Sequence, residues 1–392
     1  MPINKLKLEV SQRCEAVSQS EIRAMSVECE KYRGINLAQG VCDVPLPDPV
    51  RQGAQKAIDA GCNTYTRHDG LAELRTAIAG KVKSFNGITC DPETDVVVTS
   101  GSTGAFMSAC MALLDPGDEV ILFEPSYGYH VTTLLSVGAR PVFVTLRGRE
   151  WSFSPEDLKR VLTDRTKGIL INTPANPSGK VFGFEELSWI ADFARENDLF
   201  VFTDEIYEYI VYDGGKHISP ATLPGMAERT ITISGYSKTF SITGWRVGYC
   251  VADRRWAQMI GYMHDLVYVC APAPLQRGVA DGIVALGKSD YYANLLADLT
   301  EKRELICRTL RGVGLIPHVP AGAYYVLADV SRLTGSTSKE RVMGLLRKTG
   351  VACVPGEAFF HDPSDGFQLA RFCFAKTTAD LQEACQRLSG LE

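Results

Sequence analysis

Short apolar runs alternate with amphipathic segments through the middle of the chain. Apolar runs of about four to eight residues are typical of buried strands, and apolar residues three or four positions apart are typical of helices. The pattern predicts strands at 95–99, 119–123, 141–146, 168–172, 199–204 and 230–234. It predicts helices at 105–114, 131–137 and 185–196, and one that begins at Ser154-Pro155. This alternation indicates an α/β fold of three layers, in which helices cover both faces of a mostly parallel sheet.

The pattern changes after residue 288. A long amphipathic helix is predicted at 289–311, and shorter segments follow it: strands at 324–330, 351–354 and 369–375, and helices at 339–348 and 379–388. We interpret this part as a smaller α+β domain and expect a hinge near the start of the long helix.

Length and composition allow a large buried core. The chain has 392 residues, of which 45% are hydrophobic, so two domains are expected. Its net charge is -5, and no segment is strongly basic, which argues against nucleic acid as a partner. The N-terminus lacks the apolar stretch of a signal peptide, and charges, proline or glycine interrupt the apolar runs. We therefore expect a cytoplasmic protein with no membrane partner.

Cysteine and histidine do not predict a metal site. The 12 cysteines form no C-x-x-C pair, and neither they nor the 6 histidines have the spacing of a zinc site. We expect reduced thiols and no metal.

Polar residues gather where the predicted strands end, which is the edge at which open α/β sheets bind ligands. The segment 100–104 (Ser-Gly-Ser-Thr-Gly) joins a strand to a helix, and helix starts stabilise phosphate. The segment 172–179 contains Asn176, whose amide is suited to binding a ligand oxygen. Each segment taken alone is equally compatible with an ordinary turn.

Two further segments carry ionisable groups. Asp204 ends a strongly hydrophobic strand, where a carboxylate needs a cationic partner unless it simply caps a helix, and Tyr207 follows one turn later. Lys238 lies just past another strand, where burial makes an amine nucleophilic, and the guanidinium of Arg246 is suited to phosphate. A lone lysine is usually a surface residue, but this one lies among hydroxyl, glycine and arginine residues.

These segments, in this order, resemble the fold type I aminotransferases of class I/II, the family of aspartate, aromatic and kynurenine aminotransferases. The resemblance covers about residues 36–375, and its most specific parts are 237–249, 176–179 and 204–207. It implies a pyridoxal 5'-phosphate enzyme that moves an amino group from an L-amino acid to a 2-oxo acid. It also implies a large cofactor domain at 49–288 and a small domain formed by 1–48 and 289–392.

The resemblance implies roles for individual residues at the cofactor. Lys238 matches the lysine that carries the cofactor as a Schiff base and then moves the substrate's α-proton. Asp204 matches the carboxylate that keeps the pyridine nitrogen protonated, and Tyr207 and Asn176 match the residues that bind the phenolic oxygen. Tyr127 matches an aromatic residue that stacks on the ring. The phosphate contacts fall on Ser102, Thr103, Ser237 and Arg246.

Other matched residues concern the substrate and a second subunit. Arg371 matches the arginine that binds the substrate's α-carboxylate, and Asn176 and Gly40 match further substrate contacts, that of Gly40 being a backbone contact. Tyr65 matches a tyrosine that reaches the phosphate of the neighbouring subunit, which implies a homodimer with shared active sites. Many relatives have a phosphate-binding serine where this chain has Gly235, so either Ser234 or Ser237 is expected to replace it.

Three alternatives remain open from the sequence. Carbon–sulfur β-lyases share the fold and nearly all of these residues, and a non-catalytic regulator on the same fold is a second alternative. A nicotinamide-dependent oxidoreductase is disfavoured because no G-x-G-x-x-G turn follows the first strand. The substrate is also open: some relatives that use dicarboxylic amino acids have a lysine at the position of Thr103, and Tyr65, Tyr127, Tyr129, Phe359 and Phe360 would suit an aromatic substrate.

Overall fold

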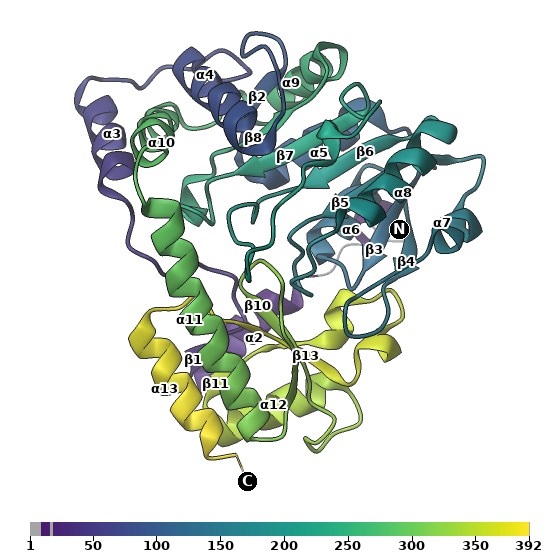
Figure 1. Ribbon diagram of the computed structural model, residues 1–392, viewed down its shortest axis with the longest axis vertical. Coiled ribbons are helices and arrows are strands. Elements are labelled where there is room, and N and C mark those ends of the chain that lie inside the picture. The colour runs from purple at the N-terminus through teal and green to yellow at the C-terminus, as the bar shows by residue number, and fades with distance from the viewer. Residues whose placement is uncertain (1–8, 16–18, 392) are drawn as a thin grey trace, which may run out of the picture.

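The computed structural model describes residues 9–15 and 19–391 of the chain (Figure 1). Its centre is a seven-stranded sheet in the order β2-β8-β7-β6-β5-β3-β4. The strands are β2 Val96–Thr99, β3 Glu119–Glu124, β4 Arg140–Thr145, β5 Thr166–Asn172, β6 Phe200–Asp204, β7 Thr230–Gly235 and β8 Gly248–Val251. All neighbouring pairs are parallel except those of β8, which runs antiparallel to both β2 and β7. The predicted parallel sheet is therefore confirmed, with one reversed strand that the pattern did not predict.

Helices cover both faces of this sheet, as the α/β pattern predicts. They are α3 Asp48–Asp59, α4 Ala72–Lys81, α5 Gly101–Leu113, α6 Gly128–Ser136, α7 Pro155–Val161, α8 Phe184–Glu196, α9 Arg254–Tyr268 and α10 Ala273–Leu286. Successive strand residues point to opposite faces: Leu170 packs in the cluster with α5, whereas Ile169 and Ile171 pack in the cluster with α8. Both faces of the sheet are thus buried, which explains why its strands are apolar without alternation.

The last quarter of the chain forms a second, four-stranded sheet in the order β12-β13-β10-β9. Its strands are β9 Ile316–His318, β10 Tyr325–Asp329, β12 Val354–Pro355 and β13 Leu369–Cys373, and a separate parallel pair joins β1 Ile35–Asn36 to β11 Val351–Ala352. The helices are α1 Gln12–Glu15, α2 Glu21–Lys31, α11 Tyr291–Gly312, α12 Ser338–Thr349 and α13 Thr378–Ser389. Through the β1–β11 pair, the N-terminal segment lies beside the C-terminal one (Figure 1).

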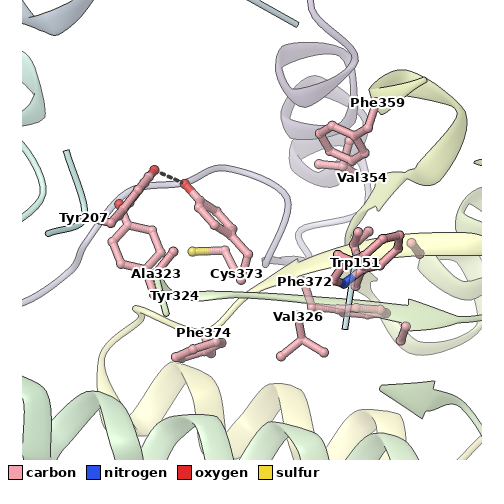
Figure 2. Packing of buried hydrophobic residues seen from close by; sticks show 14 of the residues in the cluster. Trp151, Tyr207, Ala323, Tyr324, Val326, Val354, Phe359, Phe372, Cys373 and Phe374 are labelled. Carbon is pink, nitrogen blue, oxygen red and sulfur yellow. Dashed lines mark hydrogen bonds between the residues drawn. The ribbon is translucent and has the colours of Figure 1, made fainter. Parts of the chain in front are cut away.

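One hydrophobic cluster connects the two sheets. It includes residues from the central sheet, such as Ile169. It also includes residues from the second sheet, such as Phe372, which Figure 2 labels. Tyr207, which follows β6, lies in this cluster with its ring centre 5.1 Å from that of Tyr324, and the two rings are nearly perpendicular. The segment after β6 is therefore held between the two sheets by aromatic packing.

The sequence predictions are confirmed for most elements, with ends that differ by a few residues. The predicted start of α7 is correct: Ser154 caps the helix, its backbone N–H donates to Asp157 Oδ2 over 2.9 Å, and Pro155 is the first residue. Helices α3, α4, α9 and α10 were not predicted.

The division into domains at residues 49–288 stays a prediction. Within the described ranges, every helix is too short or too polar to cross a membrane.

A buried ion pair anchors α4 to the segment after β6. The Lys81 ammonium lies 2.5 Å from Glu208 Oε1 and donates to Asn86 Oδ1 over 2.9 Å. Burial raises the pKa of Glu208, but the charges of Lys81 and His217 and the hydrogen bonds from Lys81 and Asn86 together outweigh this effect, so the pKa of Glu208 is lowered. Ser234, on β7, donates a hydrogen bond to the same Glu208 oxygen over 2.9 Å. The pair therefore connects α4, the segment after β6 and the end of β7.

Removal of one member of this pair leaves the other as an uncompensated buried charge. We expect Lys81→Met to lower the free energy of unfolding by about 3–5 kcal/mol. The double variant Lys81→Met/Glu208→Leu removes both charges and should recover part of that loss. Guanidinium chloride unfolding of the wild type, both single variants and the double variant gives the coupling energy. A Lys81→Met protein as stable as the wild type would contradict the role given to this pair.

Candidate active site

A cavity of about 440 Å³ lies where the carboxyl edge of the central sheet meets the N-terminal segment and the second sheet. It is lined by residues from far apart in the sequence: Ser20, Ile22, Arg23, Gln39, Gly40, Val41, Ser102, Thr103, Tyr127, Tyr129, Asn172, Asn176, Asp204, Ile206, Tyr207, Ser237, Lys238, Thr243, Gly244, Arg246, Tyr325 and Arg371. The residues matched to cofactor and substrate roles all contribute to this lining except Tyr65 and the alternative serine Ser234, and Phe359 and Phe360 are not part of it.

The register of the sheet brings the polar segments together. Asn172 ends β5 opposite Asp204 at the end of β6, and Asp204 pairs with Ile233 near the end of β7. The Asn172 amide donates to the backbone oxygen of Asp204 over 2.9 Å and accepts a hydrogen bond from the Asn176 N–H over 2.7 Å. The turn that carries Asn176 is thus fixed to the neighbouring strand.

Asp204 presents a carboxylate to the cavity from a buried position. Its Oδ2 lies 2.9 Å from His130 Nε2, and its Oδ1 accepts a hydrogen bond from the Ile206 N–H over 3.3 Å. His130 is itself buried and packs edge-on against Phe106 and Tyr127. The sequence gave no reason to distinguish His130 from the other histidines, because its partner Asp204 is 74 positions away.

The start of α5 and the Arg246 guanidinium form a site suited to an anion. Gly101 has φ +72°, and a Cβ atom there would lie 2.5 Å from the Nη2 atom of Arg246. A Cβ on Gly248 would lie 2.5 Å from the Ser102 nitrogen. Both positions therefore require glycine for the arginine and β8 to approach the first turn of α5. The free N–H groups of that turn and the guanidinium favour a phosphate-like group.

The structure separates the two candidate serines. Ser234 is fully buried and donates to Glu208 Oε1 and to the backbone oxygen of Glu205, away from the cavity. Ser237 lines the cavity together with Arg246. Ser237 is therefore the serine available to a ligand in this cavity.

Lys238 places a reactive amine in the cavity. Its ammonium donates a hydrogen bond to the Gly40 oxygen over 3.0 Å, and the Tyr324 hydroxyl donates to the same oxygen over 3.3 Å. Burial lowers the pKa of Lys238 to about 8, against the opposing effects of Cys373, Cys42 and Asp204. A larger fraction of this amine than of an ordinary lysine is therefore uncharged near neutral pH, which is the state that attacks a carbonyl carbon.

Arg371 is a fully buried cation with neutral partners. Its exposed fraction is 0%, its Nη1 atom donates to Asn176 Oδ1 over 2.7 Å, and its Nη2 atom donates to the Ala38 oxygen. The guanidinium also lies over the Tyr325 ring, 4.3 Å from its centre, while its Nε atom has no partner among the described residues. A buried charge that lacks a counter-ion is costly, so the site is prepared for a carboxylate from outside the chain.

Tyrosines surround the remaining walls. The hydroxyls of Tyr207 and Tyr325 share a hydrogen bond of 2.8 Å, and burial raises the pKa of Tyr207. Tyr127 lies with its ring centre 5.3 Å from that of Tyr129. Tyr325 and Arg23 were not expected at the site, because no local motif marks these positions, and Tyr129 was expected only as a residue that would suit an aromatic substrate. Tyr65 lies outside the cavity, and 81% of its surface is exposed.

Comparison with known proteins identifies the family. The family model "Aminotransferase class I and II" matches residues 32–388. The chain belongs to the class I and II aminotransferases. It is 34% identical to an aspartate aminotransferase of Pyrococcus abyssi, with 97% of each chain covered. It is 35% identical to kynurenine–oxoglutarate transaminase 3 of Rattus norvegicus, with 89% of this chain and 83% of the relative covered.

Solved structures agree with this assignment. The N-succinyldiaminopimelate aminotransferase of Mycobacterium tuberculosis superimposes with a TM-score of 0.94 at 35% identity, covering 98% of this chain and 100% of that one. The expected fold, a fold type I aminotransferase with a mostly parallel sheet, is therefore confirmed, as is the expected enzyme class. This aminotransferase moves an amino group between an amino acid and a 2-oxo acid.

The pKa of Lys238 predicts how its reactivity depends on pH. An amine with a pKa of about 8 is cationic below that pH and uncharged above it, so its reaction with an aldehyde should rise to half its maximum near pH 8. In protein stripped of any bound aldehyde, brief reductive methylation followed by peptide mass spectrometry measures this. Lys31 is the control, because the hydrogen bond that its ammonium donates to Glu28 raises the pKa of Lys31. Equal pH profiles for the two lysines would refute the lowered pKa.

Proposed function

We propose that this aminotransferase binds pyridoxal 5'-phosphate covalently through Lys238 and uses the cavity as its active site. The observation that carries the proposal is one cavity that contains an amine with a lowered pKa, a buried carboxylate and an anion site. These three groups fit the aldehyde, the pyridine nitrogen and the phosphate of the cofactor, respectively. The fit rests on Lys238, Asp204 and Arg246.

The remaining cavity residues fit the rest of the cofactor. Ser102, Thr103 and Ser237 lie around the anion site with Arg246 and would bind the phosphate. Asn176 and Tyr207 would donate to the phenolic oxygen, and Tyr127 would stack on the ring. Asp204, held by His130, would keep the pyridine nitrogen protonated.

The chain's own residues then account for the transfer. When bound, the cofactor supplies an aldehyde that combines with amines and a cationic ring that withdraws electrons from the substrate's α-carbon. Arg371 binds the α-carboxylate, which fixes the α-hydrogen relative to Lys238. The Lys238 amine takes that proton as a base and returns it as an acid, for which a pKa of about 8 is well matched. The Gly40 oxygen, which also accepts a hydrogen bond from the Tyr324 hydroxyl, holds the amine nearby when it is free.

A homodimer is part of the same proposal. One face of α9 exposes apolar side chains at Met259, Tyr262 and Leu266, and 76% of Leu266 is exposed. Such a stripe at helical spacing is typical of a surface that another protein covers. Tyr65 also stands outside the cavity of its own chain, so it would serve a phosphate site only in a second copy.

We further propose the division into domains at 49–288 and at 1–48 with 289–392, and a location in the cytoplasm.

Replacement of Lys238 tests the central step. We expect Lys238→Ala to retain pyridoxal phosphate without a covalent bond and to lose turnover by about 10²–10⁴-fold or more, because the proton-transfer group is gone. Borohydride reduction followed by mass spectrometry should find the adduct on Lys238 in the wild type and none at residue 238 in the variant. The control Lys31→Ala should keep both activity and adduct. Substantial turnover by Lys238→Ala would overturn the assignment.

The dimer is tested by placing a charge on the exposed face of α9. Leu266→Glu should shift the protein towards monomer in size-exclusion chromatography and lower its activity, because Tyr65 would no longer reach a neighbouring site. Phe184→Glu, at an exposed apolar residue of α8, is the matched control and should leave both unchanged. A Leu266→Glu protein that elutes as the wild type does, with full activity, would exclude this face as the interface.

A further inference from the structure

His264, on α9, is a buried histidine that the proposed chemistry does not use. It is 0% exposed, and its Nε2 atom accepts a hydrogen bond from the backbone N–H of Ser100 over 2.9 Å. Ser100 directly precedes α5, and Ser102 and Thr103 in the first turn of that helix line the cavity, whereas His264 does not. The histidine therefore contacts the candidate phosphate site from behind, through the backbone.

The packing of α9 on α5 holds the His264 ring in place. Ile260 and Ala257 lie one and two turns earlier on the same face of α9, and both are buried in one hydrophobic cluster with Ala105 of α5. The His264 ring stacks on that of Tyr268, with ring centres 5.0 Å apart and an angle of 30° between the planes. The position of the acceptor relative to the start of α5 is thus set by two packed helices.

The hydrogen bond from Ser100 fixes the protonation state of this ring. A backbone N–H only donates, so Nε2 carries no proton, and the neutral ring carries its proton on Nδ1. Burial lowers the pKa of His264 to about 4, because the opposing effects of the His68 backbone and the Asp265 charge are smaller. His264 is therefore neutral at physiological pH and presents a constant acceptor to Ser100.

The peptide unit between Thr99 and Ser100 is the point where β2 passes into α5. The Thr99 hydroxyl donates to the Gly101 oxygen over 3.0 Å, and Gly101 has φ +72°, so the chain bends tightly here. The first N–H groups of a helix have no partner within the helix and are free to bind an anion. The acceptor of the Ser100 N–H turns that one amide towards α9, and it thereby sets the direction in which the following amides point.

We propose that His264 is a positioning residue for the cofactor phosphate, which holds the Ser100 amide so that the free N–H groups at the start of α5 face the anion site. The inference rests on the proposed function and deepens it. Arg246 and Ser237 would bind the phosphate directly, whereas His264 would act only through the turn. Without its acceptor, the half-buried Ser100 N–H would lack a partner, and the turn would shift to satisfy it.

Two substitutions separate the acceptor from the ring. His264→Gln keeps an acceptor oxygen near the position of Nε2 but loses the ring, and His264→Phe keeps a ring that stacks on Tyr268 but has no acceptor. The full chain, stripped of cofactor, is titrated with pyridoxal 5'-phosphate and with pyridoxal, which lacks the phosphate. His264→Phe should weaken binding of pyridoxal 5'-phosphate by about tenfold and leave that of pyridoxal within about threefold. His264→Gln should stay within about threefold of the wild type for both ligands.

The matched control is His318→Phe. His318, on β9, also packs against an aromatic ring, with its ring centre 4.8 Å from that of Trp151, and burial lowers the pKa of His318 as well. It does not line the cavity, so its replacement should leave both affinities unchanged. Guanidinium chloride unfolding of each cofactor-free variant shows whether a change in affinity comes from a loss of fold.

A spectroscopic readout reports on the phosphate itself. The phosphorus NMR resonance of the bound cofactor depends on the groups around its phosphate. It should move in the His264→Phe holoenzyme and stay at the wild-type position in His264→Gln. A residue that only stabilised the fold would leave this resonance unchanged in the folded holoenzyme.

The outcomes distinguish this inference from the proposed function. The role of His264 is overturned if His264→Phe binds pyridoxal 5'-phosphate as the wild type does, if it loses affinity for both ligands equally, or if His264→Gln is impaired as much as His264→Phe. A wild type that binds no pyridoxal 5'-phosphate would refute the proposed function instead. Titration with inorganic phosphate, followed by phosphorus NMR, would then still test His264, since equal phosphate binding by the wild type and His264→Phe would contradict its role.

Discussion

The arrangement of the active site depends on an excess of positive charge in a partly buried cavity. Four basic residues line it, and Asp204 is the acid of the described lining. Arg371 shows this constraint most clearly, because it is fully buried and its partners are an amide, a backbone oxygen and an aromatic ring. The chain holds these cations in place with neutral groups, so their charges stay available to phosphate and carboxylate ligands.

The tertiary structure must bring these charges together without allowing them to relax into internal ion pairs. Glycines do part of this: Gly101 and Gly248 let Arg246 and β8 approach the first turn of α5. A second set of groups lies behind the site, where Lys81, Glu208 and Ser234 join α4 to the ends of β6 and β7. At the end of β6 and just after it, Asp204 and Tyr207 line the cavity while Glu208 joins this buried network, so one short segment contributes to both the candidate site and the buried ion pair.

The buried charge of Arg371 lies where the two sheets meet. Arg371 lies on β13, paired with Leu327 of β10 and Val354 of β12, while the partner of its Nη1 atom, Asn176, follows β5 of the central sheet. A substrate carboxylate at Arg371 would therefore lie at the junction of the two sheets. Arg23, from the N-terminal helix, approaches this junction from a third segment of the chain.

The sequence by itself determined the α/β class, most strands and helices, and the candidate residues for the chemistry. It could do so because strand ends, glycine turns and short motifs such as 204–207 and 237–249 are local in the chain. Only the tertiary structure shows that Ser237, and not Ser234, faces the cavity, and that β8 runs antiparallel to its neighbours in an otherwise parallel sheet. It also shows that His130 contacts Asp204 and that Tyr325 and Arg23 line the cavity. These features depend on contacts between segments tens to hundreds of residues apart, and hydrophobic periodicity carries no information about which distant residues meet.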